Sequence, residues 1–290
     1  MENTQKTAVV TGVSTGIGRA ITTSLIGDGW RVFGSVRKES DAHDARASLG
    51  EAFTPLVFDV TDRAAIDRAA QQVKDALGGR TLDGLVNNAG VAVAGPLRYL
   101  NLDDLQRQID INVYGPFRVT QAFLAQLGAD HALAGAPGRI VNMGSVAGKM
   151  ASPFMAPYAI SKHALEAMSE SLRRELIVHG IDVVVIGPGA IRTPIWSKSD
   201  ELDVEQYKGT EYYDVLVRMR TMMQTIGEQG LPPEDVGKLV LGVLKGEKRK
   251  TRYAILRNRL MMWTLPNLLP KRLVDSMIAK RFGFERRGDA

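Results

Sequence analysis

The chain has 290 residues, of which 44% are hydrophobic and 24% charged, as in ordinary soluble globular proteins, and this length allows one large α/β domain or two small ones. It has no cysteine, which excludes disulfides, thiolate catalysis and cysteine-ligated metals. The net charge of +5 is uneven, because Lys245 to Ala290 holds thirteen Lys or Arg against four Asp or Glu, which leaves −4 for the rest.

The two ends of the chain narrow the class of protein further. The first residues, MENTQKTAVVTG, lead into an expected strand without the succession of basic, apolar and cleavage regions that marks a secretory signal. No apolar run approaches the ~20 residues of a spanning helix. The basic tail lacks a nucleic-acid motif with interleaved aromatics. We therefore expect a cytoplasmic protein with no nucleic-acid partner and no metal site.

Short apolar runs alternate with longer stretches of helical period, which is typical of βαβ units around a parallel sheet. The expected strands are Thr7–Thr11, Arg31–Ser35, Pro55–Asp59, Gly84–Asn87, Arg139–Asn142, Ile181–Ile186 and Tyr253–Leu256. The expected helices with apolar stripes are Ile66–Leu77, Leu102–Leu127, Tyr158–Val178 and Glu234–Leu244. This pattern predicts an α/β fold: one domain with a doubly wound parallel sheet of about seven strands over residues 1–256.

A glycine-rich turn follows the first strand. Gly12, Gly16 and Gly18 in TGVSTGIG have the spacing G-x-x-x-G-x-G and open the first helix. Glycines let the backbone approach a phosphate closely, and a helix N-terminus offers unpaired N–H groups. The turn therefore favours a pyrophosphate site, although a glycine-rich turn can also be only a tight βα connection.

The second expected strand ends in Ser35-Val36-Arg37-Lys38. A protein that prefers NAD usually has Asp or Glu here to hold the ribose 2′-hydroxyl, whereas a cation suits a 2′-phosphate. This favours NADP(H) over NAD(H). The alternative is that Arg37 and Lys38 belong to a solvated turn.

Tyr158 and Lys162 lie four residues apart on an expected helix, and Ser145 stands thirteen residues before Tyr158. Positions i and i+4 share one helix face, so both side chains can open onto the same cleft. An adjacent ammonium is expected to lower the pKa of a phenol toward a useful range. Tyr158 is thus the candidate acid/base, although such a pair also occurs by chance on solvated helices.

Residues 194–230 break the α/β alternation, are rich in charge and methionine, and follow a strand end where ligands bind in open sheets. We interpret them as a substrate lid. An apolar wall for the substrate is offered by Val146, Met150, Pro153, Phe154, Met155, Ile195, Trp196, Met219, Met222 and Met223. The last three have helical spacing, which favours core or interface packing over substrate contact.

The C-terminal extension, residues 257–290, has a basic amphipathic pattern. Its apolar positions include Leu260, Met261, Met262, Trp263, Leu268, Leu269, Leu273, Val274, Met277, Ile278 and Phe282, with Lys and Arg between them. Such a segment can lie on anionic lipid, cap the pocket or pack on a partner subunit.

These motifs together make the chain resemble the short-chain dehydrogenase/reductase family over roughly residues 6–256. The motifs that carry the resemblance are TGVSTGIG, Asp59-Val60, Asn87-Asn88-Ala89-Gly90, Asn112 in DINVYG, Ser145 in IVNMGS, Tyr158 and Lys162 in YAISK, and Pro188-Gly189-Ala190-Ile191-Arg192-Thr193. The spacing of the glycines resembles the simple oxidoreductase branch. Gly144 stands where the family often has Ser.

The resemblance implies a Rossmann-like fold, a nicotinamide cofactor and a four-residue catalytic set. Tyr158 would transfer the proton, Ser145 would bind the reacting oxygen, Lys162 would hold the ribose and lower the pKa of Tyr158, and Asn112 would anchor a water in a proton relay. The implied cofactor-binding residues are Gly12, Ser14, Thr15, Gly16, Ile17, Gly18, Arg37, Lys38, Asp59, Val60, Asn88, Ala89, Gly90, Tyr158, Lys162, Pro188, Gly189, Ile191 and Thr193.

The tail and Arg37 are similar to those of retinol and hydroxysteroid dehydrogenase-like members. This implies an apolar secondary alcohol and ketone, or an alcohol and aldehyde, of steroid, retinoid or long-chain type. The family also implies a homodimer or homotetramer. The alternative is a non-catalytic NADP(H)-binding regulatory protein, or an interaction protein at a membrane surface.

Overall fold

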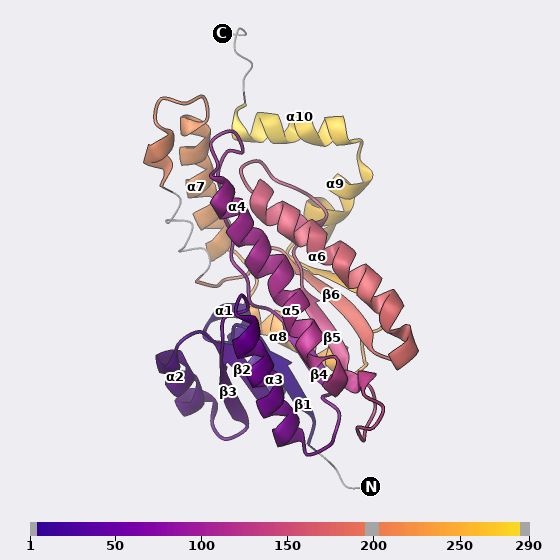
Figure 1. The fold of residues 1–290 in the computed structure, drawn as a ribbon. Helices are drawn as coiled ribbons and strands as arrows, with labels where there is room; N and C mark the ends of the chain where they lie inside the picture. Colours follow the sequence, from indigo (N-terminus) through magenta and orange to yellow (C-terminus); the bar gives the residue numbers. More distant parts are fainter. Residues whose placement is uncertain (1–4, 195–202, 285–290) are drawn as a thin grey trace.

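The computed structural model describes residues 5–194 and 203–284, and their centre is a single sheet of parallel strands (Figure 1). The strands are β1 Thr7–Val10, β2 Arg31–Val36, β3 Phe53–Val57, β4 Gly84–Asn87, β5 Arg139–Met143, β6 Asp182–Pro188 and β7 Arg252–Ile255. They lie in the order β3-β2-β1-β4-β5-β6-β7, and every neighbouring pair is parallel. The predicted doubly wound sheet is confirmed.

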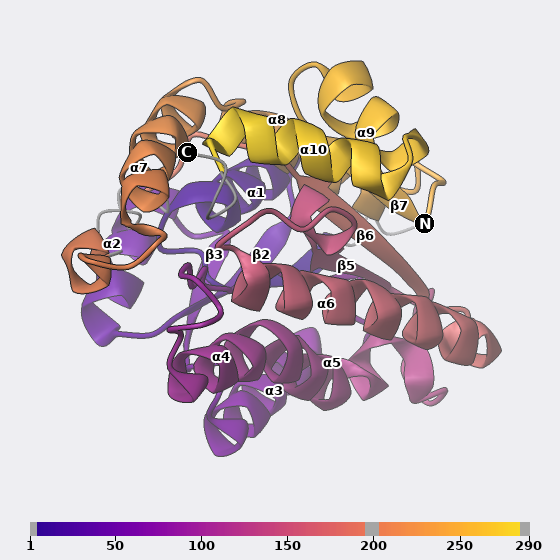
Figure 2. The same cartoon turned by 90° about the horizontal axis from the view of Figure 1, so that it is seen from above.

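Helices cover both faces of this sheet (Figure 2). They are α1 Gly16–Gly27, α2 Glu39–Leu49, α3 Arg63–Leu77, α4 Leu102–Ile109, α5 Gly115–Phe123, α6 Ala156–Glu175, α7 Tyr213–Glu228, α8 Pro233–Leu244, α9 Leu265–Leu268 and α10 Lys271–Phe282. Side chains of α1, α2 and α8 form one core with the sheet, and side chains of α3, α5 and α6 form the other. The strands β1, β4 and β6 are buried on both faces, which is why they are nearly continuous apolar runs.

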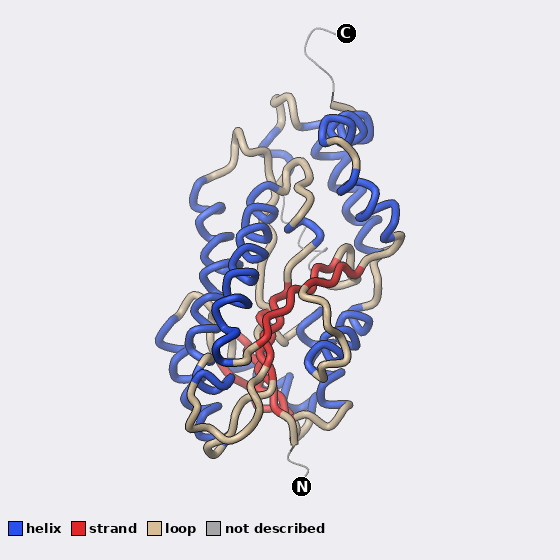
Figure 3. The backbone as a smooth tube through the Cα atoms, turned by 90° about the vertical axis from the view of Figure 1, so that its right-hand side faces the viewer, coloured by secondary structure: helices blue, strands red, loops and turns tan. Residues whose placement is uncertain are grey.

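The strand order places the functional residues at the C-terminal end of the sheet. The chain runs from β1 through β2 to β3 on one side and then returns to β4 on the other side of β1, and ligands bind at such a switch point, outside the carboxyl ends of the strands. Because all the strands are parallel, each delivers its C-terminal residues to the same end of the sheet, which Figure 3 shows between the two layers of helices. The glycine turn after β1 lies at the centre of this end of the sheet.

Three segments differ from the sequence-based elements. Helix α2 has no counterpart among the expected helices, because its charged sequence has a weak apolar stripe, with only Ala42 and Ala45 buried. The expected helix Leu102–Leu127 is α4 and α5 joined by a π-helical turn, Asp110–Tyr114, with a second π-helical turn at Ala125–Ala129. Within the expected lid, α7 is a regular helix of sixteen residues.

The C-terminal extension packs on the domain at two places. Its π-helical turn, Leu260–Thr264, lies near β7, while Phe282 and Phe284 at its far end pack on a buried cluster formed by Phe154 and the lid. Within residues 5–194 and 203–284, no helix is both long and apolar enough to cross a bilayer.

Candidate active site

The glycine turn forms a cradle whose three glycine positions leave little or no room for a side chain. Gly12 and Gly16 have φ of +72° and +60°, values that favour glycine, and a Cβ on Gly18 would lie 2.1 Å from the carbonyl oxygen of Gly12. Asn88 Nδ2 fixes the turn by donating to the carbonyl oxygens of Thr11 and Gly12 at 2.9 and 3.1 Å. The helix α1 begins at Gly16, so its free N–H groups face this space. The turn fits a dinucleotide pyrophosphate.

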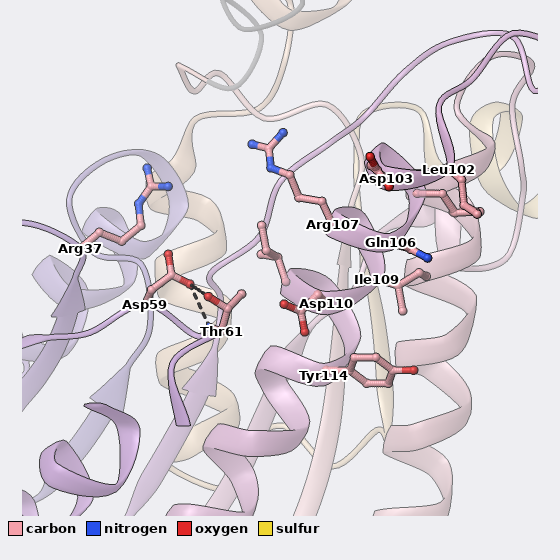
Figure 4. Close-up of a pocket in the computed structure, with 12 residues that line it drawn as sticks. Arg37, Asp59, Thr61, Leu102, Asp103, Gln106, Arg107, Ile109, Asp110 and Tyr114 are labelled. Atoms are coloured by element: carbon pink, nitrogen blue, oxygen red, sulfur yellow. Dashed lines mark hydrogen bonds between the residues drawn. The ribbon is translucent and has the colours of Figure 1, made fainter. Parts of the chain in front are cut away.

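A groove of about 980 Å³ lies between the ends of β2 and β3 and the helix α4 (Figure 4). Arg37, just beyond β2, and Asp59, beyond β3, line one side, and Arg107 on α4 lines the other. Asp59 Oδ1 accepts from the backbone N–H and the hydroxyl of Thr61, at 2.9 and 2.8 Å, which fixes its carboxylate. Arg37 is exposed, so its guanidinium is accessible to an anionic group in the groove. Lys38 follows it at the N-cap position of α2.

The segment after β6 returns to the glycine turn. A Cβ on Gly16 would lie 3.3 Å from the Cβ and Cγ2 atoms of Thr193, so these two residues are close neighbours. Gly189 donates its N–H to the Ile255 carbonyl oxygen at 2.8 Å, which ties this segment to β7. The structure thus brings Thr193 to the cradle, while its contact with a cofactor stays a prediction.

Ser145, Tyr158 and Lys162 come together from β5 and α6. Ser145 lies just beyond the end of β5, where its Oγ donates to the Pro188 carbonyl oxygen at 3.4 Å and also lowers the pKa of Tyr158 by hydrogen bonding. Lys162 is buried, its Nζ atom lies 5.6 Å from the centre of the Tyr158 ring, and it donates to the Met143 carbonyl oxygen at 2.8 Å. The spacing of four residues on α6 therefore places phenol and ammonium side by side, as predicted.

The pKa of Tyr158 is displaced in the direction opposite to the prediction. Burial of the hydroxyl raises it, and the hydrogen bond with Ser145 offsets only part of this effect. The pKa of Lys162 is lowered to about 8 by burial, against which the Glu166 carboxylate acts. The prediction is wrong because it considers the charge of Lys162 without the loss of water around the phenol. Burial therefore favours the protonated form of Tyr158.

Asn112 lies inside the first π-helical turn, a distortion that is frequent at functional sites. Its amide donates to the Val91 carbonyl oxygen at 2.9 Å and to Ser161 Oγ at 3.1 Å, and its Oδ1 accepts from the Val91 N–H at 2.9 Å. Ser161 in turn donates to the Tyr158 carbonyl oxygen at 2.7 Å. Asn112 therefore connects the end of α4 to the helix that carries Tyr158, while its part in a proton relay stays a prediction.

The remaining predicted residues lie around the same C-terminal end of the sheet. Ser14 and Thr15 belong to the turn, and Ile17 lies in the first turn of α1. Val60 is buried beneath Gly115, Ala89 donates its N–H to Thr11 Oγ1, and Gly90 contacts Asn112. Pro188 and Ile191 lie on either side of Gly189. Ile195 and Trp196, proposed for the apolar wall, lie outside the described residues. Met219 is buried in the cluster formed by Phe154 and the lid, and Met223 packs against it, as expected for packing residues.

Sequence reasoning missed two groups of site residues. Gln108 is fully buried one turn before Asn112 and holds the loop after β4, accepting from the Val93 N–H at 2.7 Å and donating to the Val91 carbonyl oxygen at 2.8 Å. The i,i+4 spacing of Gln108 and Asn112 was a readable signal. Glu166 and Arg252 also lie beside the site with little exposure, but they are 86 residues apart in the sequence, so no local pattern joins them.

Comparison with known proteins gave consistent matches. A family model described as short chain dehydrogenase matches residues 6–203. The NADPH-dependent 3-dehydrocapnine reductase of Ornithobacterium rhinotracheale is 39% identical over 94% of this chain and 96% of its own. Retinol dehydrogenase 5 of Mus musculus is 31% identical, over 93% and 86% of the two chains. The crystal structure of a short-chain dehydrogenase from Streptomyces avermitilis covers both chains fully, with a TM-score of 0.75 and 28% identity.

Proposed function

Since the chain belongs to the short-chain dehydrogenase/reductase family and is an oxidoreductase, we propose that it interconverts an apolar ketone and its secondary alcohol, or an aldehyde and its alcohol, with NADP(H). The observation that carries the proposal is that Ser145, Tyr158 and buried Lys162 come together beside the glycine cradle. These side chains can bind a carbonyl oxygen and give it a proton.

The bound cofactor would supply the hydride, which leaves the protein to orient the carbonyl and to move one proton. Ser145 would donate a hydrogen bond to the reacting oxygen. Tyr158 would give its phenolic proton to the same oxygen as negative charge develops there. Because burial raises the pKa of Tyr158, the protonated phenol is favoured, and this is the form that a proton donor needs. Lys162 would place a positive charge beside the phenol and hold the ribose.

Two features support NADP(H) in particular. Arg37 opens onto the groove just beyond β2, next to the strand end where an NAD-binding protein usually has a carboxylate and this chain has Val36. The relative from Ornithobacterium rhinotracheale carries NADPH in its name. We propose that Arg37, with Lys38 beside it, binds the 2′-phosphate.

The apolar substrate class is supported by aromatic side chains that converge near the site. Phe154, in the loop after Ser145, stacks edge-on with Tyr212 of the lid at a centroid distance of 5.5 Å, and Phe284 of the tail lies 5.8 Å away. Tyr99 lies 6.4 Å from Tyr207 between the loop after β4 and the lid. We propose that this aromatic cluster covers a steroid-, retinoid- or long-chain-like carbonyl compound.

Initial rates of NADPH oxidation, beside NADH, against steroid, retinoid, aliphatic and aromatic carbonyls test the function. Turnover of a bulky apolar carbonyl with preference for NADPH is expected. Preference for NADH would refute the cofactor assignment. The absence of turnover, with NADPH binding intact by titration, would instead support the regulatory alternative.

Arg37→Glu should reverse the preference for NADPH. The substitution exchanges a cation for an anion that repels the 2′-phosphate, so the Kd of NADPH should rise about tenfold or more, the scale of a lost charge-assisted hydrogen bond, while that of NADH changes little. Arg63→Glu is the control, since Arg63 pairs with Asp67 on the exposed face of α3. Equal losses of NADPH and NADH binding would show that Arg37 does not select the cofactor.

We further propose that the tail contacts an anionic lipid surface from a cytoplasmic location. Leu260, Met261, Leu268 and Met277 are 69%, 64%, 77% and 56% exposed, although this segment also carries many Lys and Arg residues. Exposed apolar side chains among cations suit a headgroup layer. The end of the tail also packs on the lid through Phe282 and Phe284, so capping and lipid contact are compatible.

Leu268→Glu combined with Met277→Glu should abolish sedimentation with vesicles of phosphatidylserine and phosphatidylcholine. Both side chains are exposed, so folding should be unaffected, and binding by the unaltered protein should weaken as salt screens the cations. Val178→Glu is the control, because Val178 is 76% exposed and lies outside the tail. Equal sedimentation of all three proteins would remove the lipid proposal. The predicted homodimer or homotetramer is a separate question for sedimentation velocity.

A further inference from the structure

A buried ion pair lies directly behind the site. Glu166 lies one helical turn after Lys162 on α6, and Arg252 opens β7. Arg252 Nε donates to both carboxylate oxygens of Glu166, at 2.8 and 3.0 Å, and the two side chains are only 19% and 7% exposed. Lys149 Nζ approaches the same carboxylate at 3.8 Å. Breaking such a buried pair is costly, so the arrangement fixes the relative positions of α6 and β7.

Three glycines leave the space that the pair occupies. A Cβ on Gly144 or Gly148 would lie 3.3 or 3.2 Å from Glu166 Oε1, and a Cβ on Gly187 would lie 2.7 Å from Arg252 Nη2. The glycine at position 144, where the family often has Ser, therefore belongs to this arrangement. The absence of side chains at these glycines leaves room for the ion pair beside the backbone of Ser145.

The pair reaches the site along two routes. Arg252 Nη2 donates to the Ser145 carbonyl oxygen at 3.1 Å, so the guanidinium holds the backbone of the residue that hydrogen-bonds Tyr158. The Glu166 carboxylate favours the charged form of Lys162, whereas burial favours the neutral form. The charged or titratable groups around Lys162 and Glu166 in these contacts are Tyr158, Arg252 and Lys149.

The outer face of Arg252 is covered by the C-terminal extension. The guanidinium carbon lies 4.5 Å from the centre of the Trp263 ring, in the π-helical turn that follows β7. A guanidinium stacked on an aromatic ring is held in a fixed plane. The extension thereby contributes to the support of Ser145.

We propose that Arg252 and Glu166 are positioning residues, in which Arg252 holds the backbone of Ser145 and Glu166 keeps Lys162 charged. The inference rests on the proposed function of Ser145, Tyr158 and Lys162. It predicts that the two residues affect different measurable quantities, because one acts on geometry and the other on charge.

Glu166→Gln should lower the pH at which Lys162 loses its proton. The substitution removes a neighbouring negative charge, so the ammonium is less favoured and its titration should fall by about one pH unit below its present midpoint. NMR of 13C-labelled lysine, with the Lys162 signal assigned by Lys162→Met, measures this without turnover. In the kinetics, the alkaline limb of kcat/KM should move the same way.

Glu170→Gln is the matched control, since Glu170 lies one further turn along α6 and pairs with exposed Arg174. It should leave the titration of Lys162 unchanged. Should Glu166→Gln fail to fold, Lys149→Gln is a second variant at a 46% exposed side chain, and it should move the titration upward by removing a cation. If the titration of Lys162 is unchanged in Glu166→Gln, or shifts equally in Glu170→Gln, Glu166 does not keep Lys162 charged.

Arg252→Lys keeps the positive charge but loses the fork that reaches both Glu166 and Ser145. It should lower kcat about tenfold, the scale of a small displacement of a reacting group, with KM and the titration of Lys162 little changed. Arg174→Lys is its control. An unchanged kcat in Arg252→Lys overturns the geometric route. If the unaltered enzyme is active but the variants change neither kcat nor the titration of Lys162, the inference fails while the proposed function stands. If the unaltered enzyme shows no turnover, the proposed function is contradicted instead.

Discussion

Replacing Tyr158 by Phe should lower kcat by at least about two orders of magnitude, the usual scale of general acid–base assistance, while NADPH still binds. The ring would stay in place beside Lys162, but the proton donor and the hydrogen bond with Ser145 would be lost. Steady-state rates on a carbonyl accepted by the unaltered enzyme, together with fluorescence titration of NADPH, measure both effects.

Tyr253→Phe provides the matched control for this experiment. It removes a phenolic hydroxyl on β7 that accepts from the Lys250 N–H and should leave the rate unchanged. Full activity in Tyr158→Phe would exclude Tyr158 as the acid. A loss of both rate and NADPH binding would indicate instead that the hydroxyl organises the cofactor site.

Gly18→Ala should abolish binding of either nicotinamide cofactor, because the cradle cannot hold its shape around a side chain. The added methyl group would lie 2.1 Å from the Gly12 carbonyl oxygen and 2.5 Å from Asn88 Nδ2. Real Cβ atoms do not approach a backbone oxygen so closely, so the turn and the Asn88 contacts must shift. Isothermal titration with NADPH and NADH measures the loss.

Gly27→Ala tests whether any alanine in α1 has this effect. Gly27 is the last residue of the same helix, and a methyl group added there would meet no atom within 4 Å outside its own helix, so the substitution should be neutral or slightly stabilising. Thermal unfolding of both variants separates loss of the cradle from loss of the fold. Cofactor binding by Gly18→Ala equal to that of Gly27→Ala would show that the turn does not hold the pyrophosphate.

The strands were predictable to within a few residues because the apolar runs that form them are buried on both faces of the sheet. Gly84–Asn87 matched fully, and β2 extended by one residue to Val36. The tail could be recognised as amphipathic, but the residues with which it packs could not be inferred, because Phe282 contacts a lid cluster more than fifty residues earlier. Local periodicity carries no information about such partners.

The site was predictable where spacing along one element fixes the geometry. The four-residue step from Tyr158 to Lys162 places both on one face, and the glycine spacing places Gly12 and Gly18 in one turn. The direction in which the pKa of Tyr158 moves was not predictable, because it depends on how much protein surrounds the hydroxyl. A sequence displays the neighbouring charge but not the exclusion of water.

The place of β7 at the edge of the sheet has a consequence for synthesis of the chain. Residues 252–255 pair with β6, whose own residues precede them by more than sixty positions. Until they emerge from the ribosome, the outer edge of β6 presents unpaired backbone N–H and C=O groups on a buried, strongly apolar strand. A growing chain therefore passes through a stage with an aggregation-prone edge, and a chaperone that shields apolar strands would act at that stage.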